Sequence, residues 1–319
     1  MFALLLVFPF VASSEWLLDA AFFGLMYAAL AVSWNIIGGY GGYVWLGLIS
    51  FYGVGAYGEA LAFQHSATSS AWLPLVAAVP IGLGAGLVAI PLGLLLLRVR
   101  GAVFAVVSLA LLFLAEIFAS NLSAITHGAE GMGLPTAPGG SGPFALPFYL
   151  AMLALVAGAM LVSWTILRSR LGLTLLAIRS DEERARGLGA PTTTVKLVAF
   201  CASCALAAMI GAVWADYIGF IYPIFAFSAN TMFAVVMMVY LGGRGTLWGP
   251  FVGALLVAPA QEYLAFTLGQ SQLYLIAYAV VFLVVIRWLP RGIVPTVRDF
   301  ATRRVARRRV SMGEGEVVA

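Results

Sequence analysis

Six of the seventeen lysine and arginine residues of this 319-residue chain lie in residues 168–196, whose sequence is RSRLGLTLLAIRSDEERARGLGAPTTTVK. Charged residues make up only 9% of the chain, so this stretch is a concentrated polar segment between apolar runs. Its residues predict a short charged helix over 177–188, ended by Gly189 and Pro191. Such a helix suits the binding of a soluble partner, to whose movements the flanking apolar helices would respond. The residues expected to take part are Arg179, Asp181, Glu182, Glu183, Arg184, Ala185 and Gly189.

Two carboxylic acids, Glu59 and Glu116, interrupt apolar runs elsewhere in the chain. A charged group at membrane depth is costly, so each is by default a candidate for a transport pathway. The competing interpretation is a protonated or hydrogen-bonded carboxyl with a structural role. The sequence leaves both interpretations open for these two residues and favours the structural one for Glu262.

Other chemistries find little support. A GxxxxGK[ST] loop, which holds phosphates with backbone amides and a lysine, does not occur in the sequence. The two histidines, His65 and His127, fall on different predicted connections, which argues against a metal site. Cys201 and Cys204 lie on one predicted helix and are interpreted as small core residues rather than a disulfide. The chain is therefore expected to be neither an enzyme nor a binder of a metal or cofactor.

The composition predicts the fold class. Hydrophobic residues make up 63% of the chain and the mean hydropathy is +1.03, whereas about one-quarter of a soluble domain is charged. One crossing needs about 20 apolar residues, so the length allows about 8–10 crossings. We predict an all-α integral membrane protein, a polytopic helical bundle, with residues 1–290 as one transmembrane domain and 291–319 as a basic tail. The net charge of +4 gives no reason to expect a nucleic-acid partner.

Apolar runs mark the individual segments. A short run at 2–12 has no lysine or arginine before it and is interpreted as an N-terminal membrane segment rather than a signal peptide. The stretch 38–58 holds eight glycines in 21 residues, which permits close helix packing or a discontinuous helix. The predicted longer segments are 16–37, 38–58, 72–97, 102–120, 148–167, 197–214, 228–241, 249–266 and 273–289.

The positive charges divide cleanly between the two sides. If the segments alternate, the connections 64–71, 121–147, 215–227 and 267–272 contain no lysine or arginine, and the other connections hold all seventeen. The positive-inside rule then predicts that 168–196 and the C-terminus are cytoplasmic and that 121–147 lies outside. The C-terminal RRVARRR run is interpreted as an anchor for anionic membrane lipid rather than a specific protein contact.

Several motifs occur along the chain in a fixed order. They are a glycine-rich stretch from Gly39 to Tyr57, LRVRGAVFA from Leu97 leading to Ala115-Glu-Ile, THGAEG from Thr126, RSRLG from Arg168, AIRSDE from Ala177, KLVAF from Lys196 and LGGRGTLWGP from Leu241. This ordered set resembles the permease subunits of branched-chain amino-acid ABC importers of the LivM type, over about residues 29–290.

The resemblance implies a transport subunit in a prokaryotic cytoplasmic (inner) membrane. Its expected partners are a second permease of the LivH type, two cytoplasmic ABC ATPases that hold ATP and Mg, and an extracytoplasmic solute-binding protein. Glu183 and Ala185, with Gly189 four residues later, fit the E-x-A-x-x-x-G coupling pattern of importers. A short helix of this kind docks in a groove of the ATPase, and glycine permits the tight return of the chain to the membrane. Closure of the ATPases would then move the attached helices as levers.

The sequence also departs from the family pattern. Tyr43, Trp45 and Leu48 stand where the family commonly has Gln, Ser and His. Together with Glu59 and Glu116 they are the candidates for the translocation path. Apolar and aromatic replacements there would widen tolerance for bulky solutes or simply improve packing, so aromatic acids, urea and short amides stand beside branched-chain amino acids as expected solutes.

One alternative comes from a different class of transport protein. A self-sufficient secondary transporter or channel could use Glu59 and Glu116 as proton or cation sites. Such a carrier would not need the cytoplasmic signature in 168–196, and this is the feature that argues against it.

Overall fold

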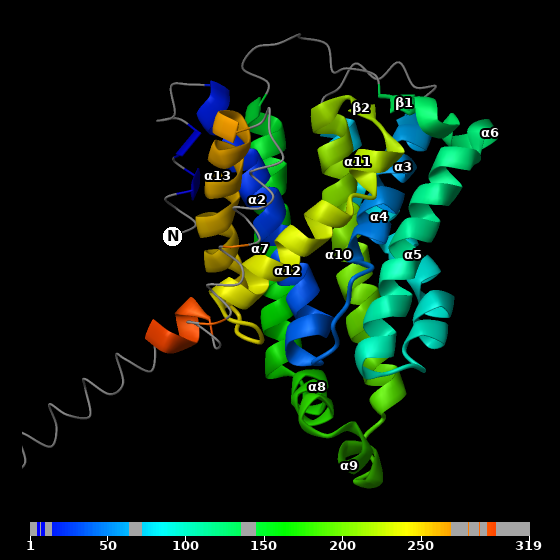
Figure 1. The fold of residues 1–319 in the computed structure, drawn as a ribbon, viewed down its shortest axis with the longest axis vertical. Coiled ribbons are helices and arrows are strands. Elements are labelled where there is room, and N and C mark those ends of the chain that lie inside the picture. The colour runs from blue at the N-terminus through cyan, green and yellow to red at the C-terminus, as the bar shows by residue number, and fades with distance from the viewer. Residues whose placement is uncertain are drawn as a thin grey trace, which may run out of the picture.

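In the computed structural model, long helices lie side by side and their connections gather at two opposite ends (Figure 1). The structure describes residues 5–6, 8–9, 15–63, 72–134, 145–268, 280, 287 and 292–297. The longer helices are α2 (Glu15–Asn35), α3 (Leu48–Phe63), α4 (Trp72–Leu96), α5 (Gly101–Asn121), α7 (Ala145–Arg168), α10 (Thr192–Ile218), α12 (Ala229–Gly242) and α13 (Gly249–Leu268).

Shorter elements occupy the two ends. At one end lie α6 (Ser123–Thr126), the 3₁₀ turn η2 (Gly128–Glu130), β1 (Met132–Gly133), β2 (Phe220–Ile221) and α11 (Pro223–Ala226). The two strands pair antiparallel, Met132 opposite Ile221. At the other end lie the π-helical turn η1 (Ile36–Tyr40), α8 (Arg170–Ser180) and α9 (Glu182–Gly187).

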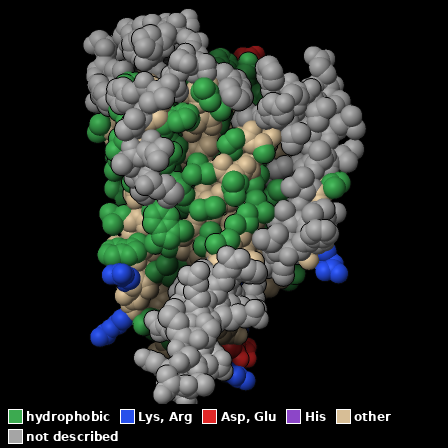
Figure 2. All heavy atoms as spheres, turned by 90° about the vertical axis from the view of Figure 1, so that its left-hand side faces the viewer, with side chains coloured by type: hydrophobic (Ala, Val, Ile, Leu, Met, Phe, Trp, Pro, Cys, Tyr) green, Lys and Arg blue, Asp and Glu red, His purple; other side chains and the backbone are tan. Residues whose placement is uncertain are grey.

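The all-α membrane fold is confirmed. Within the described residues, six helical stretches are long and apolar enough to cross a membrane, and 48–63 and 249–261 are shorter apolar helices. The outward faces of α4 and α5 carry exposed apolar side chains such as Leu87 and Val106, as expected of surfaces that meet lipid. Figure 2 shows a broad hydrophobic face with basic side chains in its lower part.

The predicted boundaries around the glycine-rich stretch are wrong. Residues 38–40 continue the first crossing as η1, residues 41–47 are not helical, and α3 begins only at Leu48. Gly42 has a φ of +81°, a left-handed conformation that favours glycine and turns the chain away from the helix. The segment predicted at 228–241 begins earlier in the structure, because α11 precedes α12 and brings the apolar stretch to 20 residues, Pro223–Gly242.

Several predicted regions fall outside the described residues. These are most of the segments 2–12 and 273–289, the connection 64–71 with His65, most of the tail 291–319, and the side chain of Glu262.

The core is built around α10, which packs against α2, α3, α4 and α7. Small residues let α10 approach α3 closely: a Cβ added to Gly55 would lie 2.0 Å from the carbonyl oxygen of Ala208, and one added to Gly211 would lie 1.9 Å from that of Tyr52. Close backbone approach through small residues is how membrane helices gain packing without a hydrophobic driving force.

The charged residues follow the predicted division. Between residues 72 and 268, the described lysines and arginines all belong to the connections α4–α5, α7–α10 and α12–α13, or to the helix ends beside them. These connections lie at the end of the bundle that carries α8 and α9 (Figure 1).

Replacing Gly211 by alanine should destabilise the protein by about 1–3 kcal/mol or more, because the added methyl group overlaps the backbone of α3. Gly158→Ala on α7 is the matched control: nothing lies within 4 Å of the added atom, and alanine is the better helix former. Thermal unfolding of both purified variants in the same detergent measures the difference. Equal melting temperatures would contradict the close crossing of α3 and α10.

Candidate functional site

The charged segment 168–196 forms two helices instead of the single predicted helix over 177–188. Asp181 separates α8 from α9 with an extended backbone, and its Oδ1 accepts hydrogen bonds from the N–H groups of Glu183 (3.0 Å) and Arg184 (3.1 Å). An aspartate in this position caps a helix N-terminus, a signal that the sequence carried and that predicts the break. After α9, Gly189 has a φ of +84° and the chain turns back toward α10, as the sequence predicts.

Glu182, the first residue of α9, is the centre of an ion-pair cluster. Its carboxylate accepts from the Lys196 Nζ (2.7 Å) and the Tyr43 hydroxyl (2.6 Å), and Arg100 Nε lies 3.3 Å away. The side chains of Lys196 and Glu182 are only 2% and 9% exposed. The Lys196 ammonium also donates to the Tyr43 hydroxyl (3.0 Å) and lies 5.3 Å from the centre of its ring. The cluster therefore ties α9 to the start of α10 and to the non-helical stretch 41–47.

The electrostatics of this cluster follow from its burial. Burial alone raises the pKa of Glu182, but the hydrogen bonds from Lys196 and Tyr43 and the charges of Lys196 and Arg100 outweigh it, so the pKa of Glu182 lies below its usual value. The pKa of Tyr43 is raised, first by burial and then by its hydrogen bond to the Glu182 carboxylate. Glu182 is thus a carboxylate and Tyr43 a neutral donor at neutral pH.

Two arginines bind the exposed carbonyl groups at the end of the first crossing. Arg179 of α8 donates from Nη1 to the carbonyl of Gly39 (2.9 Å). Arg244, between α12 and α13, donates to the carbonyls of Gly38 and Gly42 (both 3.1 Å). Carbonyls at a helix C-terminus have no partner within the helix, and these guanidinium groups satisfy them. Burial and the nearby charge of Arg244 lower the pKa of Arg179.

Asn35 completes the attachment of this helix end. Its Nδ2 donates to the carbonyl of Thr246 (2.9 Å), and its Oδ1 accepts from the N–H of Gly245 (2.8 Å). The turn between α12 and α13 is therefore joined to the end of the first crossing by Asn35 and Arg244. Arg179 joins α8 to the same helix end.

Two of the predicted coupling residues, Glu183 and Arg184, face outward from this cluster. The side chains of Glu183 and Arg184 are 85% and 87% exposed, and Leu188, just after α9, is 89% exposed. Ala185 of α9 is buried. The outward face of α9 therefore carries exposed charges and the apolar side chain of Leu188, while Glu182 holds the other face of α9 to Lys196.

The candidates for the translocation path are not brought together. Tyr43 belongs to the Glu182 cluster, whereas Trp45 and Leu48 are fully buried, Trp45 against the rings of Phe104 and Phe200. Their part in a pathway stays a prediction.

The two acids lie on different helices. Glu59 on α3 is fully buried, and neither of its carboxylate oxygens has a hydrogen-bond partner among the described residues. Glu116 on α5 is half-buried. The structure therefore leaves the role of each open and builds no shared site from the pair.

The site residues that the sequence did not single out are Arg100, Lys196 and Arg244. Each lies at the edge of an apolar run, and in the sequence these residues indicated the orientation of the segments and formed part of the family motifs, without being assigned to a site. Their individual partners come from distant parts of the chain, up to 206 residues away for Arg244 and Gly38.

Comparison with known proteins gives a consistent result. Residues 16–286 match the family described as branched-chain amino acid transport system / permease component. The chain is 31% identical over 316 residues to the high-affinity branched-chain amino acid transport system permease protein LivM of Salmonella typhimurium, covering 91% of this chain and 72% of that protein. It is 30% identical over 321 residues to LivM of Escherichia coli, covering 92% and 73%.

A more distant match covers less of the chain. The autoinducer 2 import system permease protein LsrC of Enterobacter sp. (strain 638) is 35% identical over 113 residues, which is 34% of this chain and 32% of that protein. No solved structure matches the chain significantly.

The ion-pair cluster predicts an asymmetric response to neutral substitutions. Lys196→Met leaves Glu182 in contact with Arg100 and Arg186, whereas Glu182→Gln leaves a buried ammonium without an anion. Removing one partner of a buried pair costs about 3–5 kcal/mol, so Glu182→Gln should approach that loss and Lys196→Met should cost less. The double variant should be less damaged than the sum of the two by about 0.5–3 kcal/mol.

Melting temperatures of the single and double variants measure this cycle. Arg184→Gln removes the exposed pair with Asp181 and is the control, with an expected cost of about 0–1 kcal/mol. A Glu182→Gln protein that melts like the control would show that the cluster does not hold α9 in place.

Proposed function

Because this chain belongs to the family of branched-chain amino acid transport permease components, we propose that it works as the LivM-type subunit of an ATP-driven importer that takes up branched-chain amino acids. It is a multi-pass protein of the inner membrane and a transport subunit, not an enzyme. The family membership sets aside the self-sufficient carrier that uses Glu59 and Glu116.

The proposed complex holds four kinds of protein. They are this chain, a second permease of the LivH type, two cytoplasmic ATPases that bind ATP and Mg, and an extracytoplasmic solute-binding protein. In this arrangement the end with α8 and α9 faces the cytoplasm, in line with its positive charge. The positive-inside rule puts the C-terminus on the same side in this proposal. The C-terminal basic run would lie against anionic lipid.

One observation carries the proposed mechanism: α8 and α9 are bonded to two membrane helices on one side and exposed on the other. Glu182 holds α9 to Lys196 at the start of α10, and Arg179 holds α8 to Gly39 at the end of the first crossing. A push on α9 is therefore transmitted to both helices through short charged contacts. Because packed helices move as rigid bodies, closure of the ATPases can switch the permease between inward-open and outward-open states.

The exposed face of α9 has the chemistry of a docking surface. Glu183 and Arg184 offer both signs of charge, and Leu188 offers an apolar side chain with no cover from the described part of the chain. Complementary charges of this kind give register and specificity to an interface, and a buried apolar anchor gives affinity.

The solute class rests on the relatives. LivM of both bacteria is named for branched-chain amino acids, and the LsrC match is confined to about a third of the chain. Branched-chain amino acids are therefore our first proposal, with aromatic acids, urea and short amides as the other solutes to be tested.

Glu183→Arg should separate the ATPases from transport. A reversed charge on the docking face meets like charge on its partner, which costs several kcal/mol, so ATP-dependent uptake by the reconstituted complex should fall about tenfold or more. Co-purification of the ATPases with the permease should fall in parallel. The variant should still elute as a folded protein in gel filtration, because Glu183 is exposed and contacts only Arg100 among the described side chains.

Two variants control for this change. Glu183→Gln also removes the exposed pair with Arg100, worth about 0–1 kcal/mol, but adds no positive charge and should keep most of the uptake. Glu130→Arg makes the same reversal on an exposed residue at the opposite end and should leave ATPase co-purification unchanged. Wild-type uptake in Glu183→Arg would contradict the docking role of α9.

A further inference from the structure

An aromatic pocket opens at the end of the bundle away from α8 and α9, and no predicted site residue belongs to it. Its volume is about 420 Å³, within the roughly 300–1,000 Å³ of small-molecule sites. Six elements line it: α2, α3, the end of α10, β2, α11 and the start of α12. The lining residues used below are Tyr27, Tyr52, Trp214, Phe225, Ser228 and Thr231.

The walls and the floor of this pocket differ in chemistry. Tyr27, Tyr52, Trp214 and Phe225 present aromatic rings, which bury large apolar groups well. Ser228 and Thr231 belong to the first turn of α12, where the Ser228 Oγ accepts from the N–H of Thr231 (3.4 Å). The hydroxyl groups of Ser228 and Thr231 are in the pocket lining, and a hydroxyl group can donate a hydrogen bond to a carboxylate. The pocket thus offers apolar walls and, at one side, a place for a carboxylate.

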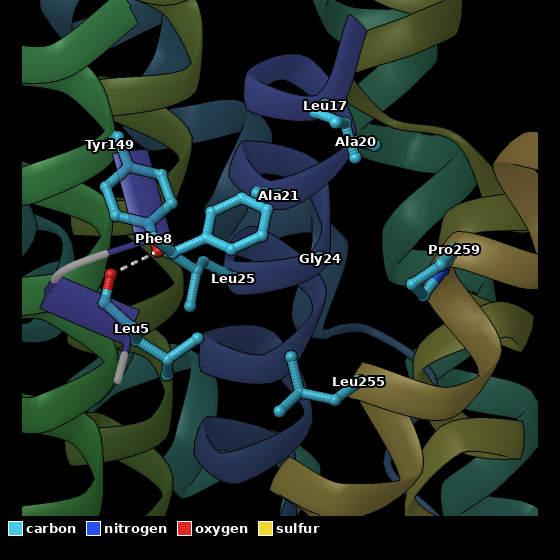
Figure 3. Close-up of a pocket in the computed structure, with 10 residues that line it drawn as sticks. All are labelled: Leu5, Phe8, Leu17, Ala20, Ala21, Gly24, Leu25, Tyr149, Leu255 and Pro259. Atoms are coloured by element: carbon cyan, nitrogen blue, oxygen red, sulfur yellow. Dashed lines mark hydrogen bonds between the residues drawn. The ribbon is translucent and has the colours of Figure 1, made fainter. Parts of the chain in front are cut away.

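A second pocket shows by contrast what a site for hydrocarbon looks like. It lies between the N-terminal residues Leu5 and Phe8, α2, α7 and α13, has a volume of about 250 Å³, and is lined by apolar groups on all sides (Figure 3). The one hydroxyl there, on Tyr149, donates to the carbonyl of Leu5 (2.8 Å) and is not available to a ligand. An amphipathic solute suits the aromatic pocket, and a purely apolar group suits this one.

Helix α12 connects the aromatic pocket with the coupling end, as α2 and α10 also do. Helix α12 begins at the pocket with Ser228 and ends beside Arg244, which binds the carbonyls of Gly38 and Gly42. Arg179 of α8 binds the neighbouring carbonyl of Gly39. A ligand that displaces the start of α12 therefore acts on the helix end to which the coupling segment is attached.

We propose that this pocket binds the transported solute on its way inward, with a bulky apolar or aromatic side chain against the rings and the carboxylate at the start of α12. The proposal rests on the proposed import function and names its solute class as amino acids with large apolar side chains. Urea and short amides, which lack such a side chain, would not be held there.

Adjacent residues of α11 provide a matched pair of variants. Phe225 and Ile224 are 63% and 64% exposed, and Phe225 lines the pocket whereas Ile224 does not. Loss of contacts in an apolar pocket changes discrimination by about 10–200-fold. Phe225→Ala should therefore lower the uptake of leucine and phenylalanine relative to alanine by about tenfold, and Ile224→Ala should stay within about twofold of wild type.

Direct occupancy can be tested with a leucine analogue that carries a photoreactive diazirine. The complete reconstituted complex, with ATPases, second permease and binding protein, is irradiated with the analogue, and labelled residues are identified by mass spectrometry. We expect labelling on the pocket residues of α10–α12, competed by leucine and reduced at least about fivefold in Thr231→Trp, which fills the pocket. Gel filtration and ATPase co-purification check that this variant is assembled.

The outcomes separate this proposal from the function on which it rests. Uptake of the analogue with labelling only elsewhere, or equal selectivity of Phe225→Ala and Ile224→Ala, would overturn the pocket and leave the importer intact. Labelling of the pocket without ATP-dependent uptake would support a ligand site there and overturn the proposed import.

Discussion

The arrangement of the cytoplasmic end depends on one buried charge, the carboxylate of Glu182. A carboxylate that is almost excluded from water is tolerated only with compensating charges and hydrogen bonds, and Lys196 is equally dependent on an anion. Each therefore requires the other, and Tyr43 donates to the carboxylate from a third part of the chain. Because the two charges cannot separate cheaply, α9 cannot move without the start of α10, which is the property that a coupling element needs.

The interrupted first crossing imposes the second constraint. A helix that ends within the protein leaves carbonyl groups without helical partners, and here Arg179 and Arg244 donate to those of Gly38, Gly39 and Gly42. Asn35, at the end of α2, binds the backbone of the α12–α13 turn in return. The side chain of Arg179 lies so close to Gly42 and Gly245 that neither position has room for a larger residue. A Cβ on Gly245 would lie 2.3 Å from Arg179, and one on Gly42 would lie 2.8 Å from it. The break is therefore a junction at which α2, α8 and α12 meet.

Local patterns in the sequence predicted much of this architecture. Apolar run length and the division of positive charge predicted the membrane segments and the grouping of their connections, and Gly189 predicted the end of the charged helix, because each depends on neighbouring residues alone. The aromatic residue Tyr43 was assigned to a pathway, whereas its hydroxyl contacts Glu182, 139 positions away. The backbone partners of Arg244 lie more than 200 positions away, and the aromatic pocket is assembled from six elements. No local sequence pattern encodes these long-range contacts, because they depend on how the helices pack.

Helix α12 gives the two ends of the molecule a common element. It starts at the aromatic pocket and ends at the junction, and the junction holds α8, which continues into the docking face of α9. If solute binding favours one position of α12, the same position must alter how α9 meets the ATPases. Linkage is reciprocal, so engagement of the ATPases must change the affinity of the pocket by the same factor. A loaded pocket and a docked ATPase would then favour the same state of the permease, which couples ATP use to the presence of solute without a contact between the two sites.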